Sequence, residues 1–189
     1  MDATAIIEVL SRTVPAAGLK PVQSADGMPT IAVTREQLVD TCRALRDTPE
    51  LRFAFLVDLF PVDYLPREPR FEIVYLMASL GMSGFGDTPK RLRVKVRVPG
   101  HDATAPSVSS VWPAANWSER EAYDLYGIHF SDHPDLRRIL MPDDWDGYPL
   151  RKDYPVQIKL PVKTYEPLQV SQEQFVASIE ATRDRARKE

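Results

Sequence analysis

The sequence predicts an α+β fold: a single domain with a mixed or antiparallel sheet packed by helices, followed by an extended, proline-rich C-terminal arm. Residues 53–60 and 71–80 are apolar on both alternating faces, which is typical of strands covered on both sides. Residues 91–98 alternate basic and apolar side chains, which predicts a strand with one buried face. We expect residues 1–155 to form the domain and residues 156–189 to form the arm.

Before these strands, the chain predicts a helix and a hairpin. Residues 2–12 carry an apolar stripe at helical spacing. Residues 19–22 and 30–33 have strand patterns on either side of Asp26-Gly27, a pair that favours a tight turn.

A second helix is expected to begin at Thr34, because Gln37 follows three residues later, as in a capping box. Its buried stripe would be Leu38, Cys42 and Leu45. Cys42 is the only cysteine, which rules out an internal disulfide and a self-contained iron–sulfur cluster, since such a cluster usually takes four thiolates.

Composition narrows the class of protein. A net charge of −3 argues against a general nucleic-acid binder. No apolar run approaches the ~20 residues that span a bilayer, and the N-terminus lacks the basic-then-apolar pattern of a signal peptide. Seventeen Pro against eight Gly indicate rigid, extended connections. The chain is therefore expected to be cytoplasmic, with any membrane link made through partners.

The strand at 91–98 places Arg91, Arg93, Lys95 and Arg97 on one face. We interpret it as an edge strand protected by charge; the alternative is a basic surface for nucleic acid or an acidic partner. Asp58, in the first apolar strand, is expected to be a hydrogen-bonded charge at a strand end rather than a functional carboxylate.

Connections and the C-terminus are less regular. Residues 81–89 predict a loop without the spacing of a phosphate-binding motif. Residues 99–116 predict a connection, and residues 156–168 an extended segment. Ser171 and Gln174 form a capping-box pattern that predicts a terminal helix.

The densest stretch is residues 117–155, which we call the signature segment. Ser118 and Glu121 predict a capping box at the start of a helix, and Glu119 near that start suits the helix dipole. Arg120 and Asp124, four residues apart, are expected to form a surface pair. The helix is expected to end at Gly127, which adopts the left-handed conformation easily.

Candidate chemistry in this segment is weak. His129, Asp132 and His133 are close in sequence, but Gly127 and Pro134 bracket them, so they do not share a helical face for metal binding. His133 is more plausibly a hydrogen-bonded turn residue. The helical carboxylates are already explained by capping, the dipole and pairing, so we predict no catalytic residue, no cofactor-binding residue and no metal ligand in this chain.

Four cations lie in the irregular half of the segment: Arg137, Arg138, Arg151 and Lys152. Arginine binds carboxylates and carbonyls in a fixed fork and is enriched at interfaces. Their placement among prolines and among Trp145, Tyr148 and Tyr154 favours docking against another protein of an assembly.

Four ordered blocks of the segment resemble the C subunit of respiratory complex I, the proton-pumping NADH:quinone oxidoreductase. They are residues 119–121 (ERE), 124–128 (DLYGI), 133–140 (HPDLRRIL) and 149–155 (PLRKDYP). Upstream, Val62-Asp63-Tyr64 and Arg70–Tyr75 also resemble that family, so the resemblance covers residues 30–155. The signature positions that we expect to shape the fold or the interface with other subunits are Glu119, Arg120, Glu121, Asp124, Tyr126, Gly127, His133, Pro134, Asp135, Arg137, Arg138, Pro149, Arg151, Lys152, Asp153 and Tyr154.

The resemblance implies a structural subunit of the peripheral arm that itself carries no cofactor. FMN, the iron–sulfur clusters and quinone would be bound by partner subunits. The resemblance implies that the chain packs mainly against the D subunit, which holds the quinone site, with the cluster-bearing B and I subunits nearby. It further implies a peripheral location on the cytoplasmic side of a bacterial membrane.

Three alternatives remain open. An equivalent subunit of an F420 dehydrogenase or of a membrane-bound hydrogenase shares much of the pattern. A free-standing hydrolase or metal enzyme would use His129, Asp132 and His133. A nucleic-acid binder would use the basic face of residues 91–97.

Overall fold

The computed structural model describes residues 2–15, 18–80, 89–155 and 171–186. Their elements are α1 Ala3–Leu10, β1 Leu19–Pro21, β2 Thr30–Val33, the 3-10 turn η2 Arg35–Gln37, α2 Leu38–Asp47, β3 Phe55–Asp63, β4 Phe71–Ser79, β5 Lys90–Val98, β6 Thr104–Pro106, α3 Ala115–Tyr126, β7 His129–Ser131 and α4 Gln172–Ala186. The chain divides into two compact units, Met1–Pro155 and Val156–Glu189.

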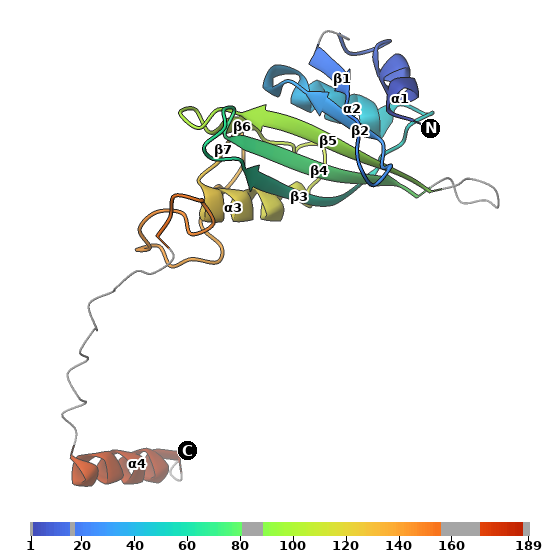
Figure 1. Cartoon of the computed structure of the whole chain (residues 1–189). Helices are drawn as coiled ribbons and strands as arrows, with labels where there is room; N and C mark the ends of the chain where they lie inside the picture. The colour runs from blue at the N-terminus through green and yellow to red at the C-terminus, as the bar shows by residue number, and fades with distance from the viewer. Residues whose placement is uncertain (1, 16–17, 81–88, 156–170, 187–189) are drawn as a thin grey trace. The chain divides into compact units, whose positions relative to one another are not determined.

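A five-stranded mixed sheet, ordered β1-β2-β5-β4-β3, forms the centre of the first unit (Figure 1). Strands β2 and β5 run parallel, and the other neighbouring pairs are antiparallel. The fold class predicted from the sequence is therefore confirmed. The hairpin of β1 and β2, with Gly27 at a positive φ of 70°, is also as expected.

Two strands occupy other positions than predicted. Strand β3 lies at an edge, so the expectation that it is covered on both faces is wrong. Phe55 and Phe60 are 54% and 39% exposed. Pro61 within β3 is the residue that indicates an edge, because proline has no N–H to give to a central ladder. Strand β5 lies between β2 and β4, so its interpretation as a charged edge is also wrong, whereas β4 is central and almost wholly buried, as predicted.

The core lies on one face of the sheet. Apolar side chains of β4 and β5 pack there with the stripes of α1 and α2, including Leu38, Cys42 and Leu45 as predicted. Figure 1 shows α1 and α2 beside β1 and β2, with α3 alongside β3. Trp112 closes the core near the start of α3 and donates from Nε1 to the Phe53 carbonyl at 3.2 Å.

Three predicted element starts are corrected. No side-chain cap forms at Thr34; it precedes the 3-10 turn η2, and α2 begins only at Leu38. The signature helix α3 begins at Ala115, so Ser118 and Glu121 lie inside it and form no capping box. The predicted connection at 99–116 contains the short strand β6, which pairs in parallel with β7.

Helix α4 has the predicted capping box. The Ser171 N–H donates to Gln174 Oε1 at 3.1 Å, and the Gln174 N–H donates to Ser171 Oγ at 3.2 Å. The predicted loop at 81–89, apart from Pro89, and the extended segment at 156–168 lie outside the described residues. Among the described residues, no helix is both long and apolar enough to cross a bilayer.

Candidate functional site

Asp124 organises the signature segment. Its carboxylate is fully buried and accepts three successive backbone N–H groups, from Ile139 at 2.9 Å, Leu140 at 2.7 Å and Met141 at 2.9 Å. Arg138 Nη1 donates to its other oxygen at 2.8 Å. Burial alone would raise the pKa of Asp124, but these hydrogen bonds outweigh it and lower the pKa. One helical carboxylate thus holds the following loop in place.

Two arginines also hold this loop, by donating hydrogen bonds to its carbonyl groups. Arg138 Nη2 donates to the carbonyls of Trp145 and Gly147 at 3.2 and 3.1 Å. Arg120 donates to the carbonyls of Arg137 and Arg138. The predicted pair of Arg120 with Asp124 is therefore wrong. Asp124 lies on the buried side of α3, where the loop supplies its partners.

Gly127 ends α3 at a φ of 69°, as predicted. A Cβ added there would lie 2.4 Å from the Tyr148 ring, so this glycine also permits a close approach. Arg151 packs over the Tyr148 ring at 4.5 Å, over the Phe71 ring at 5.4 Å, and donates to the Tyr126 carbonyl. Burial, followed by the nearby Arg70 charge, lowers the pKa of Arg151.

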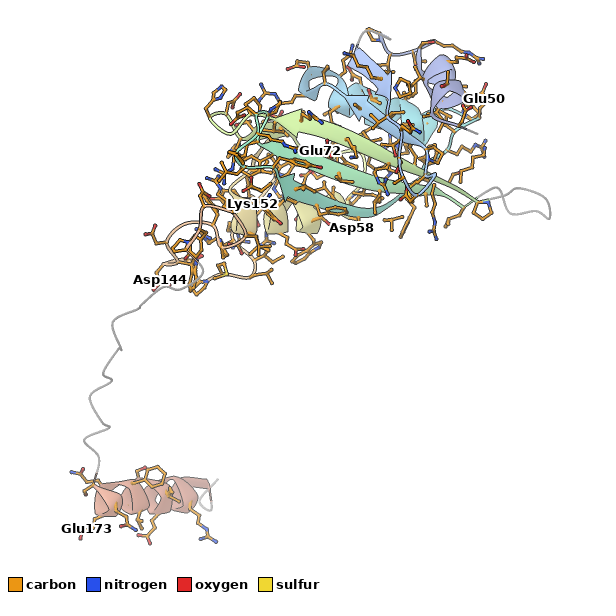
Figure 2. The ribbon with its side chains drawn as sticks, in the orientation of Figure 1. Glu50, Asp58, Glu72, Asp144, Lys152 and Glu173 are labelled. Carbon is orange, nitrogen blue, oxygen red and sulfur yellow. The ribbon has the colours of Figure 1, made fainter. Side chains whose placement is uncertain are left out.

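Arg70, immediately before β4, links the sheet to the end of the signature segment. Its guanidinium donates to both oxygens of Asp63, at 3.0 and 2.8 Å, and to both oxygens of Asp153, at 3.0 and 2.6 Å. The Lys152 N–H also donates to Asp63 at 2.9 Å. Burial tends to raise the pKa of Asp63, but these partners lower it to about 2. Figure 2 shows Lys152 near the end of the sheet.

Asp63 and Arg70 were not among the predicted site residues. The signal was present, because both lie in the two upstream blocks that share the family resemblance. Sequence spacing cannot show that these blocks meet the last block in space. The fold brings Arg70 to Asp153 across a separation of 83 residues.

Glu119, like Asp124, occupies a different environment from the one predicted from the sequence. It lies in the middle of α3, fully buried, and accepts from Ser107 Oγ at 2.6 Å and from the Val108 N–H at 2.7 Å. Burial raises its pKa to about 7, although these two hydrogen bonds act in the opposite direction. The predicted role at the helix dipole is therefore wrong, because the helix begins earlier than expected.

His133 is a hydrogen-bonded turn residue, as interpreted from the sequence. Its Nδ1 accepts from the Asp135 N–H at 3.0 Å, which leaves Nε2–H to donate to the Asn116 carbonyl at 3.2 Å. Both ring nitrogens are thus engaged, whereas His129 and Asp132 are exposed. Within residues 2–155, apart from the gaps in the description, no three His, Cys, Asp or Glu side chains are placed to hold a metal.

The remaining predicted positions contribute less. Asp135 and Arg137 form an exposed pair at 2.6 Å, and Glu121, Pro134 and the Lys152 side chain are exposed. Pro149 is partly buried, and Tyr154 donates to the Asp146 carbonyl at 3.2 Å. The buried charges of the segment, in contrast, are bonded to backbone groups and to one another.

Known proteins share both the sequence pattern and its extent. Residues 31–159 match the family model of the respiratory-chain NADH dehydrogenase 30 kDa subunit. The chain therefore belongs to this family. It is 45% identical over 156 residues to the C subunit of NADH-quinone oxidoreductase from Roseiflexus sp. RS-1, covering 82% of this chain and 86% of the relative. It is 48% identical over 143 residues to the corresponding protein of Geobacter sulfurreducens, covering 75% and 83%.

Solved structures share the fold. A trypsin-resistant fragment (1-134) of Nqo5 superposes with a TM-score of 0.56 at 34% identity, covering 69% of this chain and 99% of the fragment. A chain of an archaeal membrane-bound sulfane sulfur reductase superposes with a TM-score of 0.64 over 81% of this chain and 85% of that one. At 22% identity, this second likeness shows the fold alone.

Proposed function

We propose that this chain is a non-redox structural subunit of the peripheral arm of a proton-pumping NADH:quinone oxidoreductase. It would hold the quinone-reducing module together while partner subunits pass electrons from NADH through FMN and iron–sulfur clusters to quinone. Membership of the 30 kDa subunit family and the relatives from NADH-quinone oxidoreductases support this proposal. Those relatives do not favour an F420 dehydrogenase or a hydrogenase.

The observation that carries the structural role is the bonding of the signature charges. Asp124, Arg138 and Arg70 are satisfied by backbone groups and by acidic partners. Such satisfied networks rigidify a surface, because each partner fixes the others. Cys42 is fully buried, and burial raises its pKa well above the usual range, with the Glu119 charge adding to the shift. It is therefore held as an unreactive thiol.

The partner set and location form part of the same proposal. The D subunit would be the main partner, with the B and I subunits nearby, and contact with the membrane would be made through the complex. The chain would lie on the cytoplasmic side of the bacterial membrane. The exposed signature residues, such as Arg137 and Lys152, are available to contact these partners.

The test begins with the tagged chain purified from its own membranes in mild detergent. We expect mass spectrometry to find the flavin- and cluster-bearing subunits and the eluate to reduce quinone with NADH. A lone soluble protein, free of partners in the same membranes, would overturn the proposal.

The Asp124→Asn variant separates a structural from a catalytic role. Loss of the buried charge should reduce the amount of assembled complex several-fold, because an amide cannot accept three N–H groups and pair with Arg138 as a carboxylate does. Quinone reduction per assembled complex should stay unchanged. The exposed Asp144, labelled in Figure 2, supplies the control Asp144→Asn, which should assemble normally. A normal yield with a reduced rate per complex would contradict the structural role.

A further inference from the structure

One face of the sheet lies outside the main core cluster, and we call it the open face; on it, only Val74 and Ala78 of the central strand β4 are well-buried apolar side chains, at 4% and 7% exposure. Its members follow from the strand register, because residues directly opposite each other on paired strands point to the same side. Across the sheet, Phe60 pairs with Val74, Val74 with Lys95, Lys95 with Ala32, and Ala32 with Lys20. The core cluster contains side chains of the opposite face and none of these five.

The half of the open face on β3 and β4 is apolar. Phe55 and Phe60 are 54% and 39% exposed, and Val57, at a register shift in β3, is 53% exposed. A hollow at the end of these strands is lined by Phe55, Val57 and Leu76 among others. Contiguous exposed apolar surface of this kind marks an interaction site more often than scattered single side chains do.

The other half, on β5 and β1, is basic. Lys95 and Arg97 share one carboxylate, Glu72, at 2.8 and 3.4 Å, and Arg93 pairs with Asp26 at 2.6 Å. A groove lined by Lys20, Glu72, Lys95 and Arg97 crosses this half.

Two cations of this half remain unneutralised. Lys20 and Arg91 have no ion-pair partner among the described residues. Figure 2 marks two carboxylates on the open face, Glu72 on β4 and Asp58 on β3, and Asp26 joins them as the partner of Arg93. The five cations of β1 and β5 on this face outnumber these three carboxylates, although the whole chain has a net charge of −3. They are Lys20, Arg91, Arg93, Lys95 and Arg97.

We propose that the open face is an interface that binds an acidic, amphipathic polypeptide segment of a neighbouring protein in the assembly. Apolar side chains of that segment would cover Phe55, Val57 and Phe60, and its carboxylates would face Lys20 and Arg91. Charge complementarity selects this occupant over a second copy, which would bring a like excess of cations to a cationic surface. The proposal rests on the structural role proposed above and adds where and what the chain binds.

Photo-crosslinking identifies the occupant directly. A photoreactive phenylalanine at position 60, in the full chain within its native membranes, is expected to crosslink to another polypeptide. The crosslinked peptide should combine apolar residues with Asp or Glu. A crosslink to a second copy of this chain, to its own residues 171–186, or to a peptide without acidic residues would each overturn the proposal.

Substitutions test the two halves of the face separately. In variants without the photoreactive residue, recovery means the amount of the identified partner that co-purifies with the tagged chain. Phe60→Asp should lower this recovery about tenfold, whereas Phe60→Leu should leave it nearly unchanged. Arg91→Glu should lower recovery by a similar factor and make it more sensitive to salt. The control Arg43→Glu, an exposed position on α2, whose other side packs on the core face of the sheet, should have no effect. Circular dichroism of each purified variant checks that it is folded.

These outcomes are distinguishable from failure of the proposed function. If the wild-type chain recovers no partner, the structural role itself fails. If the wild-type chain recovers its partners, and folded Phe60→Asp and Arg91→Glu recover them equally well, only the open-face interface fails.

Discussion

At the scale of single residues, the signature carboxylates differ in their electrostatics although they share a helix. Asp124 accepts three N–H groups and pairs with Arg138, so it stays ionised. Glu119 has only a hydroxyl and one N–H as hydrogen-bond donors, so burial raises its pKa to about 7. The number of donors and the presence of a charged partner therefore distinguish these two buried carboxylates near neutral pH.

Glu119 should make the stability of the chain depend on pH. Its pKa rises on folding from 4.5 to about 7, so its contribution is greatest below pH 4.5 and falls as the pH rises to about 7. Over this window the loss is on the order of 3 kcal/mol. In Glu119→Gln, urea midpoints measured from pH 4.5 to 7.5 should vary much less than in the wild type.

Glu121→Gln, an exposed change on the same helix, is the control and should keep the wild-type slope. Equal slopes in the wild type and Glu119→Gln would show that Glu119 is ionised throughout this range. Asp63, with its pKa lowered to about 2, acts in the opposite direction, but its contribution is lost only as the pH falls below about 4, outside the window.

At the scale of elements, the end of α3 depends on one glycine. Gly127 adopts a φ of 69° and lies against the Tyr148 ring and Arg151. Gly27 has a nearly identical φ of 70° but no atom within 4 Å of an added Cβ. The pair separates the cost of the backbone conformation from the cost of the close contact.

Gly127→Ala should therefore destabilise the chain more than Gly27→Ala. Backbone strain should cost each variant about 1–2 kcal/mol. Overpacking at Gly127 should add about 1–3 kcal/mol, because the Tyr148 and Arg151 side chains are held by their mutual stacking. The free energy of unfolding in urea measures both. Equal losses in the two variants would show that the ring shifts without cost.

At the scale of the whole molecule, the boundary between domain and arm stays a prediction that truncation can test. Among the described residues, every buried side chain of the hydrophobic core lies between Ile6 and Phe130. A chain ending at Pro155 should therefore unfold with a free energy within about 0.5 kcal/mol of the full chain. A larger loss in urea unfolding would place part of the stabilising contacts after residue 155.

The family and most of the fold could be predicted from the sequence because their signals are local. The α+β class, the hairpin at Asp26-Gly27, the end of α3 at Gly127 and the capping box at Ser171 each depend on residues a few positions apart. The blocks of the signature segment could likewise be recognised by order and spacing alone.

Tertiary structure alone decided what the charged residues bind. Helix α3 begins at Ala115, earlier than predicted, so Glu119 is a buried carboxylate in the middle of the helix and not a partner of the helix dipole. Asp124 accepts hydrogen bonds from the backbone N–H groups of residues 139–141 and does not pair with Arg120. Arg70 forms an ion pair with Asp153, which is 83 residues away in the sequence. The sequence by itself determined the family, the end of α3 at Gly127 and the apolar stripes of the core helices. The hydrogen-bond and ion-pair partners that are distant in the chain are set by how β3, β4 and α3 pack. Hydrogen bonds and burial depend on distance in space rather than in sequence.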